Sequence, residues 1–206
     1  MFKQLFERVL TVPYIHLEEE TASYFAEREG NTLRLFFEGS NGKVDWANNF
    51  DFPAKPYRDM PDRWYAHRGF LRVWKAIEPH LETMIADPTV RTIYVVGYSH
   101  GAAVALLCHE YCRFHRPDAA VIGVGYGGPR VVWGPVPENV RARFRGFYVI
   151  RNGHDLVTHL PPALFGFRHV GHMIKIGVSV GPIKDHYADA IMPALGELTL
   201  GDLWTE

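Results

Sequence analysis

The spacing of apolar residues predicts a helix at the N-terminus and a hairpin after it. Five apolar side chains recur on one face of the first segment: Phe2, Leu5, Phe6, Val9 and Leu10. Further on, residues 23–27 and 33–37 are strand-like, and the Gly30-Asn31 pair between them is typical of a tight turn. The pattern therefore predicts an antiparallel pair of strands.

The next part of the chain changes from irregular to helical. Residues 41–65 are rich in aromatic side chains, and three prolines (Pro53, Pro56 and Pro61) predict that this stretch has no regular structure. Residues 69–87 return to a helical period, with six apolar side chains on one side: Phe70, Val73, Trp74, Ile77, Leu81 and Ile85. Pro79 is expected to kink this helix or to end its first segment.

Apolar strands and helices then alternate toward the C-terminus. Three stretches have the composition of buried strands: 92–96, 119–130 and 147–155. A helical stretch at 102–112 separates the first two, and a strand-like stretch at 167–180 precedes a last helical segment at 184–195. Strands separated by helices pair in parallel, so we expect an α/β fold with a mostly parallel central sheet and helices on both faces.

Composition narrows the classes of protein further. The chain has 206 residues, of which 47% are hydrophobic, and no repeat or charge block divides it, so a single domain over residues 1–206 is predicted. The formal net charge of −1 gives no reason to expect nucleic acid as a partner. Cys108 and Cys112 are expected to be reduced, because they lie one turn apart on the predicted helix.

The first residues carry no sign of a leader or a membrane span. Glu7 and Arg8 interrupt the apolar positions, which is unlike a signal peptide or a transmembrane helix. The cytoplasm is therefore the default location, while secretion with a removed leader is not excluded.

Ser99 is the first candidate for chemistry, because it lies between two glycines in residues 97–101. The apolar strand before it and the helical stretch after it predict a sharp strand-to-helix turn that lifts the serine oxygen above the sheet edge. Glycine at positions 97 and 101 relieves the crowding between strand and helix. The alternative is a small residue in an ordinary tight turn, and the strand-turn-helix context favours a nucleophile.

A serine nucleophile needs a histidine base and a carboxylate that orients it, in the chain order Ser, Asp, His for this kind of turn. Asp155 follows the apolar residues 147–150 by a short loop and reaches the same sheet edge as Ser99 and Gly128, whereas the rival Asp185 is adjacent in sequence to a candidate base. His186, at the start of the last helical segment, is the preferred base. Three other histidines are disfavoured as bases: His159, His169 and His172.

Stabilisation of an oxyanion requires hydrogen-bond donors beside the serine. The backbone N–H of His100 follows the nucleophile at a helix N-terminus, and Ser40 follows the strand at 33–37, where a second donor is expected. No metal site and no cofactor are predicted, because the histidines lack metal-ligand spacing.

Several segments in order resemble one known family, the class 3 lipases of fungal type. The similarity spans residues 24–191 and lies in six segments: 36–46, 67–74, 95–107, 125–133, 152–171 and 185–191. The resemblance implies an α/β-hydrolase fold and cleavage of triacylglycerols and related esters. It gives the triad roles to Ser99, Asp155 and His186 and the oxyanion roles to Ser40 and His100. It also implies a lid near residues 41–50.

The sequence thus predicts a serine esterase or lipase that works through an acyl-enzyme on apolar acyl esters, with transient contact to a lipid interface. Aromatic residues of the irregular stretch are candidates for substrate binding or for attaching that stretch to the core: Trp46, Phe50, Phe52, Trp64 and Tyr65. A feruloyl-type or other non-lipid esterase is the alternative within hydrolases. From another class, the alternative is a non-catalytic lipid- or partner-binding protein on the same scaffold.

Overall fold

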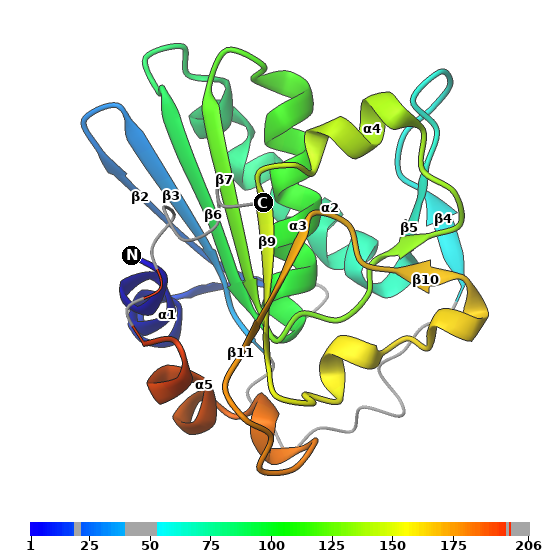
Figure 1. Cartoon of the computed structure of the whole chain (residues 1–206). Helices are drawn as coiled ribbons and strands as arrows, with labels where there is room; N and C mark the ends of the chain where they lie inside the picture. Colours follow the sequence, from blue (N-terminus) through cyan, green and yellow to red (C-terminus); the bar gives the residue numbers. More distant parts are fainter. Residues whose placement is uncertain (19–21, 40–52, 197, 199–206) are drawn as a thin grey trace.

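A central sheet dominates the computed structural model, which describes residues 1–18, 22–39, 53–196 and 198 (Figure 1). Within these residues the sheet has seven strands in the order β1-β2-β3-β6-β7-β9-β11. Their bounds are Ile15–His16, Ser23–Glu29, Thr32–Phe37, Thr92–Tyr98, Ala120–Tyr126, Phe147–Asn152 and His172–Ile176. All neighbours from β3 to β11 pair in parallel, while β1, β2 and β3 pair antiparallel. The predicted hairpin and mostly parallel sheet are confirmed.

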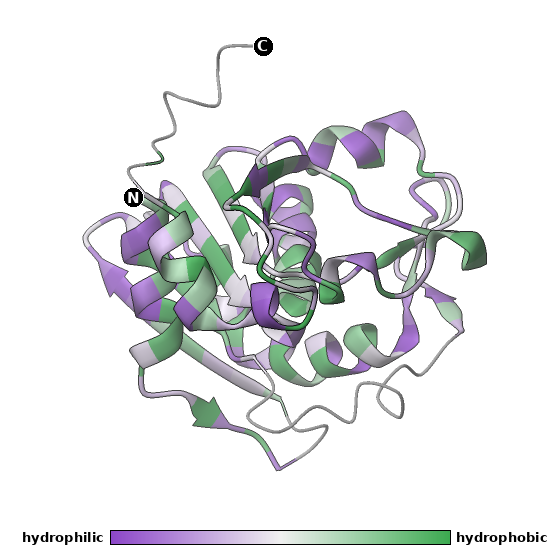
Figure 2. Ribbon diagram, turned by 60° about the horizontal axis from the view of Figure 1, so that its bottom comes forward, coloured by the Kyte–Doolittle hydropathy of each residue, from purple (hydrophilic) through white to green (hydrophobic). Residues whose placement is uncertain are grey.

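Helices cover both faces of this sheet, as predicted (Figure 1). α2 (Arg68–Ala86) and α3 (His100–His115) pack on one face, and α1 (Phe2–Thr11) and α5 (Ala188–Ala194) on the other. Alternate residues of β3 point to opposite faces of the sheet: Leu35 and Phe37 face α2 and α3, while Phe36 faces α1. Figure 2 shows apolar residues recurring along the central strands and α3, with polar residues on outer turns and helices.

The helix predictions need two corrections. α2 continues through Pro79 to Ala86, so the proline does not end the helix. Leu81 and Ile85 beyond it are buried, and the burial of this apolar face outweighs the hydrogen bond that proline cannot donate. In α1, Leu10 is 38% exposed, whereas the other four apolar residues of the predicted face are buried.

A small second sheet corrects the expectation that residues 41–65 are irregular throughout. Its described strands have the order β10-β8-β5-β4 and are antiparallel. Their bounds are Phe167–Arg168, Val132–Trp133, Tyr65–His67 and Ala54–Pro56. Pro56 is compatible with β4 because β4 is an edge strand, where a missing N–H costs no ladder bond. The strand-like stretch at 167–180 therefore supplies one strand to each sheet.

A buried carboxylate on α3 fastens the chain near this small sheet to the main body. Glu110 is fully buried and accepts hydrogen bonds from Arg58 Nη2 at 2.7 Å and from Arg143 Nε at 2.8 Å. Arg143 ends α4 (Glu138–Arg143), and Arg58 follows β4. Burial raises the pKa of the Glu110 carboxyl, although both guanidinium groups favour its ionised form.

Two further sequence-based expectations concern single features. The Sγ atoms of Cys108 and Cys112 lie 4.0 Å apart, so both thiols are free and buried, as predicted. In the part of the chain that the structure describes, no helix combines the length and the apolar character that crossing a bilayer requires.

Candidate active site

Ser99 lies where β6 passes into α3, in the conformation expected of an exposed turn nucleophile. Its φ is 55°, and no other non-glycine residue among those described has a positive φ. Such a conformation costs about 1–3 kcal/mol and persists only where the surroundings enforce it. The hydrogen bonds from Ser99 N to the Tyr126 carbonyl oxygen (2.8 Å) and from Ala102 N to the Ser99 carbonyl oxygen (3.0 Å) hold the turn on both sides.

The two glycines around Ser99 allow the strand, the helix and β3 to approach closely. A Cβ at position 97 would overlap the carbonyl group of Gly101, and a Cβ at position 101 would overlap the carbonyl oxygens of Phe37 and Glu38. The explanation from the sequence, that glycine relieves crowding at this turn, is confirmed.

Three side chains from separate loops meet in one hydrogen-bonded line. His186 Nε2 lies 2.9 Å from Ser99 Oγ, and His186 Nδ1 lies 2.9 Å from Asp155 Oδ2. All three residues are buried. With its Nδ1–H donated to the carboxylate, the imidazole has a free electron pair on Nε2 and can accept the serine proton.

The Asp155 carboxylate is held by its own loop as well as by His186. Its Oδ1 accepts the backbone N–H of Val157 at 2.9 Å, and its carbonyl oxygen accepts the Thr158 hydroxyl at 2.7 Å. Val157 and Thr158 belong to the short 3-10 helix η2 (Val157–His159). The carboxylate therefore has one oxygen fixed to backbone and the other left for the imidazole.

Two residues that the sequence analysis did not single out shape this line. Gly127 has φ +56°, and a Cβ there would lie 2.8 Å from Asp155 Oδ2 and 2.9 Å from His186 Nδ1. Tyr98 donates its hydroxyl to the His186 carbonyl oxygen at 2.7 Å, and its ring stacks on the imidazole with centroids 5.4 Å apart. Burial, with the Asp155 charge nearby, raises the pKa of the Tyr98 hydroxyl, which keeps it a donor. The glycine directly after β7 and the residue before the serine were the available signals.

The rival acid and the other histidines have different partners. The Asp185 carboxylate accepts hydrogen bonds from Ser179 Oγ, Val180 N and His154 N, while His186 contacts Asp155. His159 Nδ1 lies 3.0 Å from the Asp155 carbonyl oxygen, and His169 Nε2 lies 2.7 Å from the Thr158 carbonyl oxygen.

His172 lies in β11 and stacks on Tyr148. Burial lowers the pKa of His169 to about 4, so this imidazole is neutral at pH 7. The described contacts of His159, His169 and His172 are therefore with groups other than the Ser99 hydroxyl.

One side of the expected oxyanion site is described. His100 is the first residue of α3, where backbone N–H groups lack an acceptor within the helix. Burial lowers the pKa of its imidazole to about 4, so it is neutral at pH 7. Gly39 lies against the nucleophile turn, since a Cβ there would be 3.1 Å from the Tyr98 carbonyl oxygen and 3.5 Å from Ser99 Cβ. Ser40, the expected second donor, lies outside the described residues.

The aromatic candidates for substrate binding divide into three groups. Trp46, Phe50 and Phe52 lie outside the described residues. Trp64 is fully buried and packs edge-on against Tyr57 (4.8 Å between centroids) and Phe144 (5.5 Å), so of the two roles offered for it the structure shows attachment to the core. Tyr65 lines an apolar surface cleft of about 660 Å³ with Trp133, Phe165 and Phe167.

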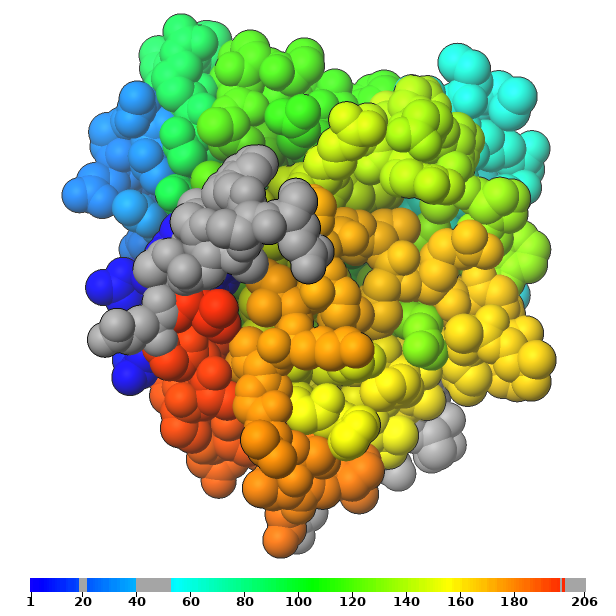
Figure 3. Space-filling view, in the orientation of Figure 1, coloured from blue at the N-terminus to red at the C-terminus, as the bar shows by residue number. Residues whose placement is uncertain are grey.

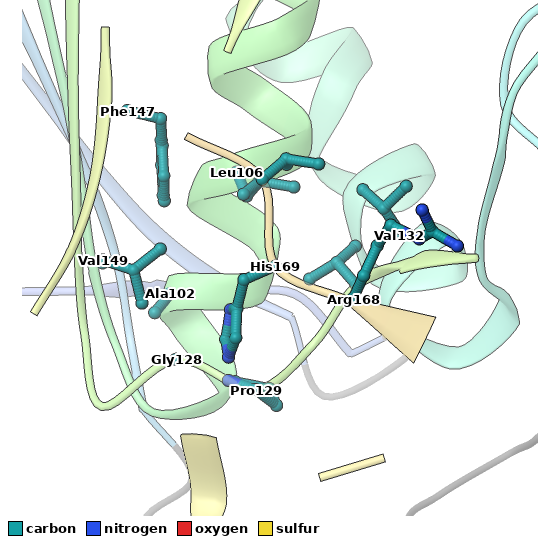
Figure 4. A pocket seen from close by; sticks show the side chains of 12 residues that line it. Ala102, Leu106, Gly128, Pro129, Val132, Phe147, Val149, Arg168 and His169 are labelled. Atoms are coloured by element: carbon teal, nitrogen blue, oxygen red, sulfur yellow. The ribbon is translucent and has the colours of Figure 1, made fainter. Parts of the chain in front are cut away.

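A smaller pocket lies behind the nucleophile helix. Figure 4 shows side chains of α3 (Ala102 and Leu106) and β9 (Phe147 and Val149), together with His169, around this space. Its volume of about 10 Å³ is roughly what one water molecule needs. It is too small for an acyl chain in this conformation.

The sequence matches a known family over most of the structure just described. Residues 34–165 match the family described as lipase (class 3). The chain belongs to the class 3 lipase family. The fungal class 3 resemblance and the α/β-hydrolase fold predicted from the sequence are thereby confirmed.

Fungal lipases are among the relatives within this family. The chain is 31% identical over 154 residues to "secreted mono- and diacylglycerol lipase 1" of Fusarium solani. The aligned region covers 72% of this chain and 44% of the relative. It is 28% identical over 156 residues to a lipase of Rhizomucor miehei, covering 68% of this chain and 40% of the relative. The chain thus spans less than half the length of these curated class 3 lipases.

Solved structures agree with the family. The Rhizomucor miehei lipase in complex with its propeptide superposes with a TM-score of 0.67 at 26% identity, over 80% of this chain and 56% of that one. A lipase II from Rhizopus niveus gives a TM-score of 0.66 at 24% identity over 82% of this chain and 66% of that one, which shows a shared fold.

Proposed function

We propose that the protein is a serine carboxylic-ester hydrolase of the lipase or esterase type, with Ser99, His186 and Asp155 as its catalytic triad. The observation that carries this proposal is the line of two 2.9 Å contacts from Asp155 Oδ2 through the imidazole to Ser99 Oγ. Membership of the class 3 lipase family supports it independently.

In the first half of the reaction, the serine becomes acylated. His186 Nε2 takes the proton of Ser99 Oγ as this oxygen attacks the ester carbonyl carbon. The carbonyl electron pair moves to the oxygen, which the N–H groups of His100 and Ser40 stabilise. The tetrahedral intermediate collapses, the bond to the alcohol oxygen breaks, and His186 gives its proton to the leaving alcohol.

In the second half, water releases the acyl group. His186 removes a proton from water, the hydroxide oxygen bonds to the acyl carbon, and the Ser99 ester bond breaks with return of the proton to Ser99. The Asp155 carboxylate orients the imidazole and stabilises the imidazolium. The buried position of all three residues strengthens these electrostatic interactions.

The substrate that we propose is an ester with an apolar acyl chain. Apolar side chains flank the loop that carries His186, and three in the segment between β11 and η4 (Lys184–His186) are strongly exposed: Val178 at 88%, Val180 at 67% and Ile183 at 62%. This segment lies in the protruding orange region at the lower edge of Figure 3. Exposed apolar groups near the site favour transient contact with a lipid interface.

The feruloyl-type or other non-lipid esterase is the alternative within hydrolases, since the same triad serves both. A non-catalytic binding protein is the alternative of another class. The strained Ser99 backbone and the buried Asp155 charge argue against it, because binding alone requires neither.

The location and the domain organisation are also proposals. The cytoplasmic default has no support from the relatives, since the Fusarium lipase is named as secreted. We therefore favour export for this protein. Separately, we propose that residues 1–206 form a single domain.

The proposal is tested by labelling with a fluorophosphonate and locating the adduct. We expect one adduct on Ser99 and none in Ser99→Ala, with turnover of p-nitrophenyl esters reduced about 10⁴-fold or more in that variant. An adduct on another residue, or equal turnover in Ser99→Ala, would contradict the triad. The chain-length profile with and without an emulsion, beside a feruloyl ester, then separates lipase from the other esterases.

A further inference from the structure

A second buried carboxylate lies beside the triad without contacting the reacting atoms. We propose that Asp185 is a positioning residue, which locks the loop carrying His186 to the loop carrying Asp155 and so aligns the imidazole. This inference rests on the proposed function, and it assigns Asp185 a role different from that of the orienting acid.

The contacts of Asp185 reach both loops. Its Oδ2 accepts the backbone N–H of His154, in the loop that carries Asp155, at 2.8 Å. The same oxygen accepts the Ser179 hydroxyl at 2.5 Å, and Oδ1 accepts the backbone N–H of Val180 at 2.7 Å. Ser179 and Val180 both lie in the loop that carries His186. The side chain is fully buried, so these donors replace water around both carboxylate oxygens.

The backbone of Asp185 adds a further tie. Its carbonyl oxygen accepts the Asn152 side-chain amide at 3.0 Å. The Gly153 backbone lies directly against the carboxylate, since a Cβ at that position would be 2.6 Å from Asp185 Oδ2. Three consecutive residues therefore touch Asp185: Asn152 at the end of β9, and Gly153 and His154 in the loop that carries Asp155.

The place of these contacts explains why they matter for alignment. The parallel ladder between β9 and β11 ends at the pair Asn152 and Ile176. Beyond this pair, two backbone hydrogen bonds still join the segments, from Gly153 N to the Ile176 carbonyl oxygen and from Leu156 N to the Pro182 carbonyl oxygen, both at 2.9 Å. Because the regular ladder has ended, these few bonds hold the loops together, and the buried Asp185 carboxylate adds its own hydrogen bonds to both loops one residue before the base.

The decisive variant is Asp185→Asn, which keeps the size of the side chain and replaces one acceptor oxygen by a donor amide. Its single carbonyl oxygen can replace only one of the two carboxylate oxygens, so either the His154 N–H or the Val180 N–H loses its acceptor and faces the new amide donor. We expect kcat for a p-nitrophenyl ester to fall about 10- to 100-fold, with KM within about twofold of the parent, because misalignment affects the chemical step.

The matched control is Asp87→Asn. Asp87 also accepts a backbone N–H and a hydroxyl, both from Thr89, but it lies before β6, at the end of that strand opposite Ser99. Unchanged kcat in this variant, with a fall in Asp185→Asn at equal Tm, supports the proposal. Equal kcat in Asp185→Asn and the parent overturns it.

If Asp185→Asn does not fold, Ser179→Ala decides instead. This variant keeps the carboxylate and removes one of its donors, so a fall in kcat of several-fold at unchanged Tm is expected. A kcat equal to that of the parent overturns the proposal.

A readout without turnover separates this inference from the proposed function. The proton shared by His186 Nδ1 and Asp155 gives a downfield NMR signal, assigned by its loss in Asp155→Asn. We expect this signal to weaken or shift in Asp185→Asn even if the parent protein cleaves no ester. An unchanged signal overturns the positioning role, whereas absence of labelling at Ser99 in the parent overturns only the proposed hydrolase.

Discussion

At the scale of single residues, the site depends on positions where a Cβ has no room or a backbone is strained. Ser99 adopts φ 55° because its neighbours Gly97 and Gly101 let strand and helix approach closely. Gly127 is the third such position, and it faces the contact between Asp155 and His186. The sequence indicated the role of the first two glycines, because they are local to the serine. For the third, the only local signal was a glycine next to the strand end, which does not reveal a role that depends on two distant side chains.

Replacement of Gly127 by alanine tests this arrangement. The new methyl group would push against Asp155 Oδ2 and His186 Nδ1, so we expect kcat to fall about 100-fold. Gly134→Ala is the matched control, because its φ is also positive (+70°) and a Cβ there meets no atom within 4 Å. Both variants should lose about 1–2 kcal/mol of stability from backbone strain. Equal kcat values in the two variants would show that Gly127 does not support the triad.

At the scale of elements, the parallel strands bring three loops to one edge, and buried polar groups fix the pieces around them. β6, β9 and β11 precede the loops of Ser99, Asp155 and His186 in turn. On the other side of α3, Glu110 joins that helix to α4 and to the segment after β4. The periods of apolar residues predicted the long strands and helices. Three strands of the small sheet, β4, β5 and β8, were missed, because segments of two or three residues have no period of their own.

The Glu110 connection predicts a large effect on stability. Glu110→Gln removes the charge between Arg58 and Arg143, which are themselves largely buried, so we expect a loss of about 3 kcal/mol in the free energy of unfolding. The exposed pair of Lys75 and Glu78 serves as comparison, and Glu78→Gln should change stability by less than about 0.5 kcal/mol. Urea unfolding measures both. Similar small losses in the two variants would mean that the buried pair adds little.

At the scale of the whole molecule, the core contains a histidine that folding keeps neutral. His109 of α3 is fully buried, and burial, with a contribution from Arg113, lowers its pKa to about 3. In the unfolded chain the same group has a pKa near 6.5. Between these values the unfolded state binds more protons than the folded one, so stability rises with pH and falls on acidification.

The expected result is a loss of stability as the pH falls from about 6.5 toward 4, with a slope of up to about 1.4 kcal/mol per pH unit from this group. His109→Gln removes this contribution and should reduce the slope over that range, while His100 and His169, whose pKa values burial also lowers, keep theirs. Urea unfolding at a series of pH values measures the slope. A variant with the slope of the parent would show that His109 does not contribute to acid sensitivity.

Across the whole molecule, the triad could be predicted from the sequence, whereas the surroundings of Trp64 could not. Ser99, Asp155 and His186 were selected from turn chemistry and chain order, and the structure brings their side chains together. Trp64 was a candidate for substrate binding or for attachment to the core, because an aromatic side chain in an irregular segment can serve either role. Its indole is buried by Tyr57 and by Phe144, which is 80 positions further along the chain, and local sequence carries no record of such a contact.

By itself, the sequence determined the order of strands and helices, the α/β class and the sharp turn at Ser99, because periodicity and glycine chemistry act over a few neighbouring residues. The α/β-hydrolase fold was implied by the resemblance to class 3 lipases. Only the tertiary structure decided which of two carboxylates faces the imidazole, and that the other one, Asp185, binds the two loops together. The physical reason is that both carboxylates lie near His186, and their partners are chosen by long-range loop packing that the order of residues does not contain.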